Sequence, residues 1–528
     1  MYQSRKSRFM RSAAVLVILI PLIGGTIVQD IRAQEADFRF ANSRALLESP
    51  YGILSNSITN LSLQNDSLWI GPYLNLSFDD GRTWYAADTD SLFGTSNRTY
   101  SLDAGPGVVA VGLGKIDNAA GGVQTATGFL MSEDGGETFE YRFPQLDQPG
   151  DSSIVYGVST LKALAIIVPQ QSPPFDLDYN HSTGDMWLAG WASGIRRSSD
   201  MGRTWKRVVL PPDDLDYVTP DSSYDFLFAP KRGGTGSLNH MGFSVLVDSK
   251  QRVWAGTAGG VNRSLDGGLS WQKFTADGTS TSIVGNWIIS LEEQVIGDES
   301  IIWMANWSTG EVPGERFGIT FTRDGGNTFR QALQGERIYD FSFVGNTVYA
   351  AGESGLFISD DGGEFWRSIR DFRGLEEPGS LIGRDEPIFS VESDSDIIWA
   401  GTSSGLLLSV DDGVNWSLDR VNVPLSSSID DPRVPTVETF AYPNPFSPAG
   451  DGFIRIRYEL SINSSVEIRI FDFAMNLVRT LELNSGAGIS EARWDGMSES
   501  GVRVANGPYF YEVKADGKQF RGKILVIE

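Results

Sequence analysis

The sequence contains no cysteine and only two histidines, His181 and His240, among its 528 residues. Without cysteine the chain has no disulfide framework, no thiolate metal site and no cysteine nucleophile. Two histidines are too few for a His-rich metal centre, and we expect neither a metal nor a cofactor. Basic side chains are also scarce, with 43 Lys and Arg against 67 Asp and Glu and a net charge of −24. This balance argues against binding to nucleic acid, which requires clustered basic residues.

Long hydrophobic runs are missing too, apart from one near the N-terminus. Residues 1–12 carry four basic side chains and no acid, and an apolar run from Ala13 to about Val28 follows. Because Ile31-Arg32-Ala33 resembles a small-residue cleavage site, we predict that residues 1–33 are a signal peptide. The alternative is a membrane anchor, but a span needs about 20 apolar residues. We therefore expect export and no stable transmembrane span.

Glycine, by contrast, is abundant, and some of the 59 glycines belong to a repeated motif. The segment Ser77–Trp84 has the pattern S-x-D-x-G-x-T-W, which recurs with small changes seven times in all. An Asp in such a turn can accept hydrogen bonds from the backbone, and Gly permits the left-handed conformation of a tight hairpin. We predict a structural role for the aspartates of the motif: Asp79, Asp134, Asp200, Asp266, Asp324, Asp361 and Asp411.

The residues before each motif predict a unit of four strands. An aromatic residue, a Gly six residues later and the motif hydroxyl ten residues later recur in one frame, as at Trp254, Gly260 and Ser264. A short alternating run precedes the aromatic residue, as in Phe243–Val247, and alternation with period two is typical of a strand. Units of four strands repeated around an axis are propeller blades. We predict an all-β fold in which a seven-bladed β-propeller spans residues 37–423.

The C-terminal part has a different pattern. Residues 424–440 are rich in Pro and Ser and are predicted to be a linker. Residues 441–528 contain six short strand-like runs, which predict a small Ig-like β-sandwich. The runs are 453–460, 465–473, 477–483, 491–494, 509–515 and 523–527.

Both parts resemble known families. The repeated motif resembles the Asp-box, or BNR, repeat of β-propellers in sialidases, xyloglucan-type endoglucanases, sorting receptors and a photosystem II assembly factor. Tyr442-Pro-Asn-Pro-Phe446, Val466–Asp472 and Gly507-Pro-Tyr-Phe-Tyr511 are similar to the Ig-like domain of flagellar hook-capping proteins. The same residues resemble the sorting domain of type IX secretion substrates. With the signal peptide, this resemblance implies a bacterial protein delivered by secretion machinery to the cell surface or medium. The alternative is an Ig-like accessory domain without a sorting role.

No catalytic motif is recognisable in the chain. The string closest to the Arg-Ile-Pro motif of sialidases, Arg433-Val-Pro435, lies in the predicted linker, and xyloglucan-type enzymes use two propellers where this chain has length for one. A P-loop is absent, and neither histidine lies near a recognisable nucleophile motif. The sequence Asp176-Leu-Asp178-Tyr-Asn180 begins like a calcium loop but has His181 where that loop requires Gly.

Propeller ligands usually bind at the loop face, formed by connections between second and third strands and between blades. Long connections here, residues 140–175, 206–241 and 307–317, combine aromatic and acidic side chains, which suit carbohydrate. We predict a non-catalytic secreted or cell-surface propeller that binds a glycan or protein ligand there. The alternative is a secreted glycoside hydrolase with paired loop carboxylates. The candidate ligand-binding residues are Trp191, Asp214, Asp216, Tyr217, Tyr224, His240, Trp307 and Glu311.

Overall fold

The computed structural model describes residues 46–48, 52–87, 97–310, 312–375, 381–384, 386–420, 439–442, 444–448, 453–515 and 517–527. The predicted signal peptide, the linker as far as residue 438, and Glu311 lie outside the described residues. Almost all regular structure is β-strand, and the described helices are two short 3-10 turns, η1 (Asn118–Ala120) and η2 (Leu238–His240). The predicted all-β class is confirmed. In the described part of the chain, no helix has the length and apolar character needed to cross a membrane.

Seven sheets of consecutive antiparallel strands follow one another between residues 46 and 419. The first contains β1 (Leu46–Glu48), β2 (Asn60–Gln64), β3 (Ser67–Gly71), β4 (Asn75–Ser77) and β5 (Tyr85–Ala87). The second contains β6 (Arg98–Gly105), β7 (Val108–Asp117), β8 (Val123–Ser132) and β9 (Glu140–Arg142). The third contains β12 (Pro174–Asn180), β13 (Asp185–Gly190), β14 (Gly194–Ser198) and β15 (Lys206–Arg207).

The remaining four sheets repeat the same plan. The fourth contains β18 (Gly242–Val247), β19 (Val253–Thr257), β20 (Gly260–Ser264) and β21 (Trp271–Phe274), and β16 (Tyr217–Val218) pairs with β21 at its outer edge. The fifth contains β22 (Trp287–Ile296), β23 (Glu299–Trp307), β24 (Gly318–Thr322) and β25 (Arg330–Ala332).

The sixth sheet contains β26 (Ile338–Val344), β27 (Thr347–Gly352), β28 (Gly355–Ser359) and β29 (Arg367–Ile369). The seventh contains β30 (Ile388–Ser393), β31 (Ile398–Thr402), β32 (Leu406–Ser409) and β33 (Ser417–Asp419).

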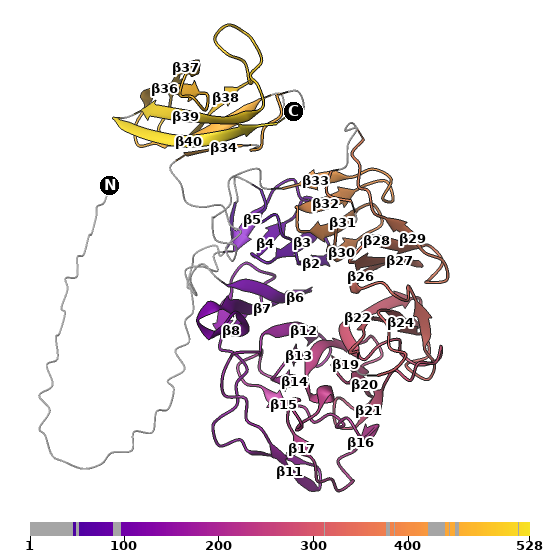
Figure 1. The fold of residues 1–528 in the computed structure, drawn as a ribbon. Helices are drawn as coiled ribbons and strands as arrows, with labels where there is room; N and C mark the ends of the chain where they lie inside the picture. Colours follow the sequence, from indigo (N-terminus) through magenta and orange to yellow (C-terminus); the bar gives the residue numbers. More distant parts are fainter. Residues whose placement is uncertain are drawn as a thin grey trace, which may run out of the picture. The chain divides into compact units, whose positions relative to one another are not determined.

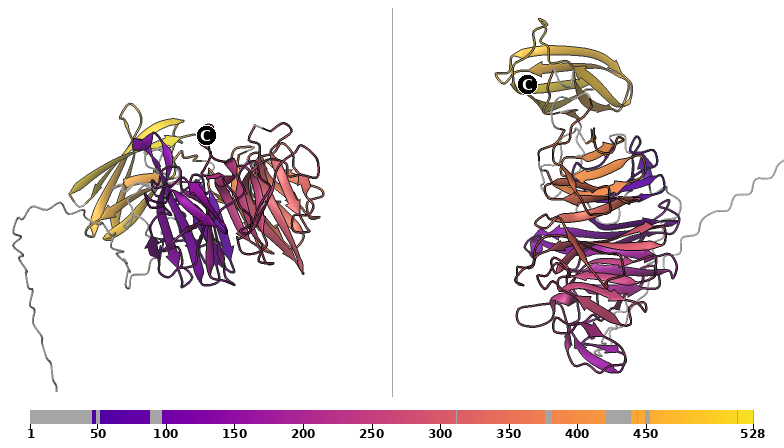
Figure 2. Two further views of the ribbon diagram at one scale, coloured as in Figure 1. Left: turned by 90° about the horizontal axis from the view of Figure 1, so that it is seen from below. Right: turned by 90° about the vertical axis from the view of Figure 1, so that its right-hand side faces the viewer.

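The seven sheets form a closed ring. The first strands β2, β6, β12, β18, β22, β26 and β30 each contact the next in this order, and β30 contacts β2. Figures 1 and 2 show the sheets standing side by side around a common axis. Such a ring of radial sheets is a β-propeller.

Within the described residues, side chains and a backbone hydrogen bond join the first and seventh sheets, and no strand is exchanged between them. The Ile58 amide donates to the Thr402 carbonyl (2.8 Å), which joins the first and seventh sheets. The Trp84 indole Nε1 donates to Asp419 Oδ2 at 2.8 Å across the same junction. Each sheet draws its four main strands from one continuous segment, and β1 adds a fifth strand to the outer edge of the first.

The repeated turns hold their own ends together. In the third sheet, Ser198 Oγ donates to Asp200 Oδ1 at 2.7 Å, and the Thr204 amide donates to the same oxygen at 2.8 Å. The Gly202 amide donates to Ser198 Oγ at 2.9 Å. These three bonds recur in all seven turns, around Asp79, Asp134, Asp200, Asp266, Asp324, Asp361 and Asp411.

Five of these turns also abut the preceding sheet, at Gly136, Gly268, Gly326, Gly363 and Gly413, which explains the requirement for glycine there. Gly136 has φ +95°, and a Cβ there would lie 2.3 Å from Cη2 of the buried Trp69 in the first sheet. Gly268 stands in the same relation to Trp187, with φ +88° and 2.5 Å. A side chain at either position would strain the backbone and collide with the indole ring. The turn glycines therefore allow consecutive sheets to pack closely.

The predicted loops 140–175 and 206–241 fold together. They supply a small sheet of β10 (Ser153–Tyr156), β11 (Ser159–Ala163) and β17 (Leu227–Phe228), in which β11 and β17 pair in parallel. Buried side chains from both segments, including Tyr156, Leu161, Leu210 and Phe228, form one core with Trp187 and Trp271 of the propeller. We call residues 144–173 and 208–241 the insertion.

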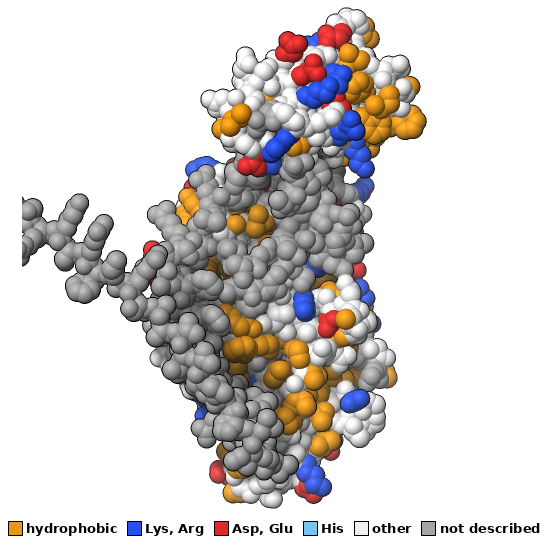
Figure 3. Space-filling view, turned by 90° about the vertical axis from the view of Figure 1, so that its left-hand side faces the viewer, with side chains coloured by type: hydrophobic (Ala, Val, Ile, Leu, Met, Phe, Trp, Pro, Cys, Tyr) orange, Lys and Arg blue, Asp and Glu red, His pale blue; other side chains and the backbone are white. Residues whose placement is uncertain are grey.

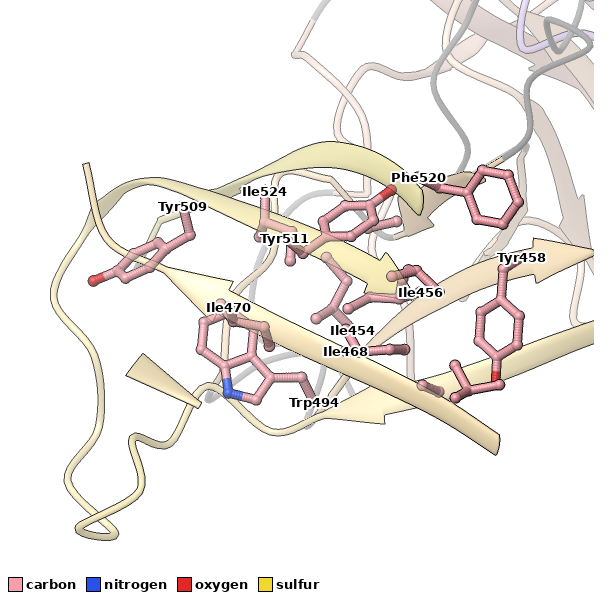
Figure 4. Close-up of a cluster of buried hydrophobic side chains, with 14 of the residues drawn as sticks. Ile454, Ile456, Tyr458, Ile468, Ile470, Trp494, Tyr509, Tyr511, Phe520 and Ile524 are labelled. Carbon is pink, nitrogen blue, oxygen red and sulfur yellow. The ribbon is translucent and has the colours of Figure 1, made fainter. Parts of the chain in front are cut away.

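The C-terminal part is a separate sandwich of two sheets. One is β34 (Thr439–Tyr442), β35 (Ile454–Leu460) and β38 (Gly488–Trp494), and the other is β37 (Leu477–Ser485), β36 (Ser464–Phe471), β39 (Gly507–Ala515) and β40 (Lys518–Val526). Alternate side chains from both sheets meet in a buried core that Figure 4 shows, with Trp494 and Tyr511 among its largest members. Strand β34 lies partly in the segment predicted to be a linker, and six predicted runs become seven strands.

Candidate functional site

The acidic candidates Asp214 and Asp216 are exposed at the edge of the insertion. Beside them, the exposed Tyr217 pairs through its backbone with Gln272 of β21, the outer strand of the fourth sheet. Beneath them, Lys273 Nζ donates to the carbonyls of Pro212 and Asp213 at 2.8 Å. These residues therefore lie on the outer edge of a sheet.

Tyr224 and His240 pack inside the insertion. The Tyr224 hydroxyl accepts a hydrogen bond from the Thr219 amide at 3.0 Å. His240 is 4% exposed, and its Nδ1 and Nε2 lie 3.1 and 3.0 Å from the carbonyls of Ala229 and Leu210. Burial lowers the pKa of the His240 imidazole, against the opposing effect of these backbone contacts. Its ring nitrogens are occupied, so His240 supports the insertion from within.

The two candidate tryptophans lie in separate aromatic clusters. Trp307 donates from Nε1 to the Ile338 carbonyl at 3.0 Å, and its ring centre lies 5.6 Å from that of Tyr339. Trp191 follows β13, and its ring centre lies 5.0 Å from Phe243 and 5.8 Å from Trp287. Both rings are half-buried. Of these two tryptophans, Trp191 lines a groove of the loop face.

This groove, of about 610 Å³, runs between the insertion and the third sheet. Exposed apolar residues from the insertion form one wall, among them Leu164, Ile167 and Val168. Figure 3 shows hydrophobic side chains gathered on one face of the molecule. The polar lining comes from Gln170, Gln171, Lys231 and Arg232, and the aromatic lining is Trp191. We call this feature the Trp191 groove.

A buried polar network fixes the wall of the groove. Asp147 Oδ2 accepts from the Ile166 amide at 2.7 Å, and Asp147 Oδ1 pairs with Arg196 Nη1 at 2.7 Å. The Arg196 and Asp147 side chains are 1% and 4% exposed. Gln145 Nε2 donates to the carbonyl of Ser172 at 2.9 Å, at the other end of the same segment. Because charged and polar side chains anchor both ends, residues 164–171 form a preorganised surface.

A second feature, the mouth of the central channel, was not foreseen from the sequence. Six of the seven inner strands contain a β-bulge at the same position, and the bulged residue is aromatic in five of them. Neighbouring rings approach one another, with centroids 6.1 to 6.3 Å apart for Tyr100, Phe175 and Phe243. The bulged residues are Tyr100, Phe175, Phe243, Ile289, Tyr339 and Phe389. Through its contact with Phe243, Trp191 extends this half-buried collar.

Below the collar, carboxylates line a cavity of about 520 Å³. Several of them accept hydrogen bonds from the backbone of the neighbouring inner strand. Asp176 accepts from the Val245 amide at 2.8 Å, and Glu392 accepts from the Leu63 amide at 3.1 Å across the ring junction. The same type of bond joins Asp103 to Tyr179, Asp178 to Val247 and Asp340 to Val391. These carboxyl groups satisfy amides that the diverging inner strands leave without a sheet partner.

Burial controls the protonation of these groups. Loss of solvent raises the pKa of Asp176 and Asp340 to about 7, although backbone hydrogen bonds oppose it. Loss of solvent and the charge of Asp340 raise the pKa of Glu392 to about 8. The pKa values of Asp178 and Glu292 are also raised, first by burial and then by neighbouring carboxylates. Among the described residues, no three Asp, Glu or His side chains are grouped to hold a metal ion.

A sequence signal for the channel did exist. The residue directly after each bulge is Ser or Asp. In four strands the third residue after the bulge is Asp or Glu, as in Tyr100-Ser-Leu-Asp103. Asp176 and Asp178, whose sequence resembles the start of a calcium loop, both lie on β12 and line the channel.

The comparison with known families supports the C-terminal sandwich as a distinct domain. A family described as the FlgD Ig-like domain matches residues 446–519. A search of curated proteins gives no significant match. Similar solved structures include PorZ, a bacterial surface component of the type IX secretion system of Porphyromonas gingivalis. The two sequences are 13% identical, the match covers 89% of this chain and 75% of PorZ, and the TM-score is 0.36.

Two further similar structures are YCF48 and a GH74 enzyme. YCF48 from Cyanidioschyzon merolae has 17% identity, with 69% of this chain and 98% of that chain covered and a TM-score of 0.41. An ancestral GH74 enzyme has 13% identity, with 89% and 60% covered and a TM-score of 0.46. Because all three TM-scores are below 0.5, we transfer no function from these proteins.

Proposed function

We propose that the protein is a secreted or cell-surface binding protein that captures a glycan through the loop face of a seven-bladed Asp-box propeller. The Trp191 groove is the observation that carries this proposal. It is the loop-face groove in which a half-exposed indole ring, amide side chains and a preorganised wall occur together. Sugars offer apolar C–H faces for an aromatic ring and hydroxyl groups for amides, so this lining suits them.

The positions of the carboxylates favour binding over hydrolysis. A glycosidase needs two carboxyl groups about 5–9 Å apart across its substrate. Asp214 and Asp216 lie on an outer sheet edge, and in the 307–317 connection the Glu315 carboxylate is bonded to the Thr309 amide at 2.9 Å. Carboxylates of the channel accept hydrogen bonds from backbone amides of the neighbouring inner strands. The Trp191 groove has no carboxylate among its described lining residues.

The Ig-like sandwich is the part that we assign to export. Its own core and its match to a domain family support a separate role from the propeller. It is also nearly neutral, with 10 basic and 11 acidic side chains in residues 439–528, whereas residues 1–438 carry 33 and 56. We propose that the sandwich delivers the propeller to the cell surface or medium through secretion machinery, after the signal peptide has been removed.

A polysaccharide panel tests the binding function. The full-length exported protein is incubated with soluble polysaccharides, and both binding and release of reducing ends are measured. The proposal predicts binding without turnover, and loss of that binding in Trp191→Ala. Turnover that disappears in Asp214→Asn or Asp216→Asn would contradict it in favour of the hydrolase.

Deletion tests the assignment of the sandwich. A chain that ends at residue 438 should fold its propeller but remain in the periplasm, as measured by cell fractionation and surface labelling. Normal surface delivery of this shortened chain would show that the sandwich is an accessory domain without a sorting role.

A further inference from the structure

The Trp191 groove differs in charge from the rest of the propeller. Residues 1–438 carry 33 basic and 56 acidic side chains, yet the charged residues that line this groove are Lys231 and Arg232. Within the described part of the chain, no acidic residue lines it. A pair of cations in a groove without acidic side chains attracts an anionic ligand.

Lys231 and Arg232 differ in whether an acidic side chain of the protein lies close to them. Lys231 Nζ lies 3.8 Å from Asp213 Oδ2, and both side chains are more than a third exposed. The Asp213 carboxylate also accepts hydrogen bonds from the backbone amides of Leu238 and Asn239, both at 3.0 Å. Arg232 is exposed and forms no ion pair with any described residue. A guanidinium in this state can bind a carboxylate through two parallel hydrogen bonds.

The position of these cations relative to the other lining groups indicates the form of the ligand. Lys231 and Arg232 follow Pro230 in a turn of the insertion, where the Arg232 amide bonds to the Thr235 carbonyl. Trp191 lies in the connection after β13, and Gln170 and Gln171 precede β12, so three separate segments of chain contribute to one groove. A ligand that contacts all three segments presents an apolar face to Trp191, polar groups to the two glutamines and a negative charge to the two cations.

We propose that the groove binds an acidic saccharide, in which the indole of Trp191 stacks on a sugar face and Lys231 and Arg232 bind the carboxylate of a uronic acid unit. This inference rests on the proposed glycan-binding function and adds the charge of the ligand to it. The carboxylate would accept charge-assisted hydrogen bonds from these two side chains beside an apolar wall, and such bonds are stronger than those between neutral groups.

Polygalacturonate and its fully methyl-esterified form are the probes, because esterification removes the charge and keeps the sugar backbone. Affinity is measured by calorimetry on the full-length exported protein at low salt. We expect binding to polygalacturonate, at least about tenfold weaker binding to the ester, and weakening of binding as sodium chloride is raised. The variant Lys231→Gln/Arg232→Gln should lose at least about tenfold in affinity for polygalacturonate and little for the ester.

Lys162→Gln provides the matched control, because Lys162 is an exposed lysine of β11 in the same insertion and does not line the groove. It should bind polygalacturonate like the unchanged protein. Equal binding to both polymers, or equal loss in Lys162→Gln, would overturn the acidic ligand. Binding to poly-glutamate without binding to polygalacturonate would assign the groove to an acidic peptide and also overturn it.

The two proposals fail in distinguishable ways. If a neutral polysaccharide binds, Trp191→Ala abolishes that binding and Lys231→Gln/Arg232→Gln leaves it unchanged, then the glycan function stands and the acidic ligand is refuted. If polygalacturonate binds and Trp191→Ala has no effect, the groove is the wrong site and both proposals fail. Circular dichroism and thermal denaturation of each variant verify that the fold is unchanged.

Discussion

Two sets of carboxylates in the propeller have opposite properties. The aspartates of the repeated turns have lowered pKa values, because hydrogen bonds from their own turn outweigh partial burial, as Thr138 does for Asp134. The carboxylates of the channel also accept backbone hydrogen bonds, yet burial raises the pKa of Asp340 to about 7. The comparison shows that the same residue type stabilises a turn as an anion and an inner strand as a neutral acid. Solvent access, rather than hydrogen bonding alone, decides between the two.

The largest expected effect is the response of the whole propeller to pH. Because the folded protein holds protons on Asp176, Asp340 and Glu392 that the unfolded chain releases above about pH 4–5, stability should fall as pH rises toward 8. A carboxyl group whose pKa is raised by about three on folding lowers the free energy of unfolding by on the order of 4 kcal/mol as the pH rises from its unfolded pKa to its folded pKa. Calorimetry between pH 5 and 8.5 measures this, and Asp340→Asn/Glu392→Gln should reduce the slope. An unchanged slope in that variant would show that the channel groups are ionised in the folded protein.

A turn aspartate should show the opposite dependence. Asp200→Ala removes three acceptor contacts to Ser198 and Thr204 and should lower stability by about 2 kcal/mol at pH 7. Because the pKa of Asp200 is lowered in the fold, the part of this loss that depends on its charge should persist down to about pH 4 and shrink as the pH falls further, through the lowered pKa of the folded state. Thermal denaturation at pH 7 and at about pH 2 compares the variant with the unchanged protein. A loss of equal size at both values would mean that the charge of Asp200 is irrelevant.

Asp419 at the ring junction lies between these extremes. Its pKa is raised by burial and lowered in part by the bond from Trp84 Nε1. Trp84→Phe removes this bond but keeps an aromatic ring, and we expect a loss of about 1 kcal/mol by thermal denaturation. Trp84→Phe combined with Asp419→Asn should cost less than the sum of the two single changes. Strict additivity would argue against a direct role of this bond in closing the ring.

The smallest effect belongs to an exposed carboxylate outside both sets. Asp214→Asn should change stability by less than about 0.5 kcal/mol at any pH between 5 and 8.5, since Asp214 is exposed on the sheet edge. The same calorimetric series serves as its measurement. A larger change would show that the pH dependence of the protein is a general surface-charge effect and not a property of the channel.

Periodic features of the sequence predicted most of the fold. The seven turns, the aromatic frame and the alternating runs repeat locally, so four-stranded units and the C-terminal sandwich could be read from spacing alone. The channel was missed because each bulge shifts the register by one residue and hides an acid such as Asp176 within an ordinary strand pattern. The groove was missed because its cation Arg232 and its wall at Ile167 lie far apart in the chain and far from Trp191. The parallel pairing of β11 with β17 helps to bring the two parts of the insertion together, and the Ala192 amide, which donates to the Gln171 carbonyl, joins the Trp191 connection to them.

Binding at the Trp191 groove is the central claim, and calorimetry with one polysaccharide tests it most directly. The strongest binder from the polysaccharide panel is titrated into the full-length protein, Trp191→Ala and Tyr217→Ala. Tyr217 is an equally aromatic candidate, 52% exposed, on the outer sheet edge away from the groove lining. The account predicts a loss of at least about tenfold in affinity for Trp191→Ala and none for Tyr217→Ala. Unchanged affinity in Trp191→Ala, or a loss confined to Tyr217→Ala, would contradict it.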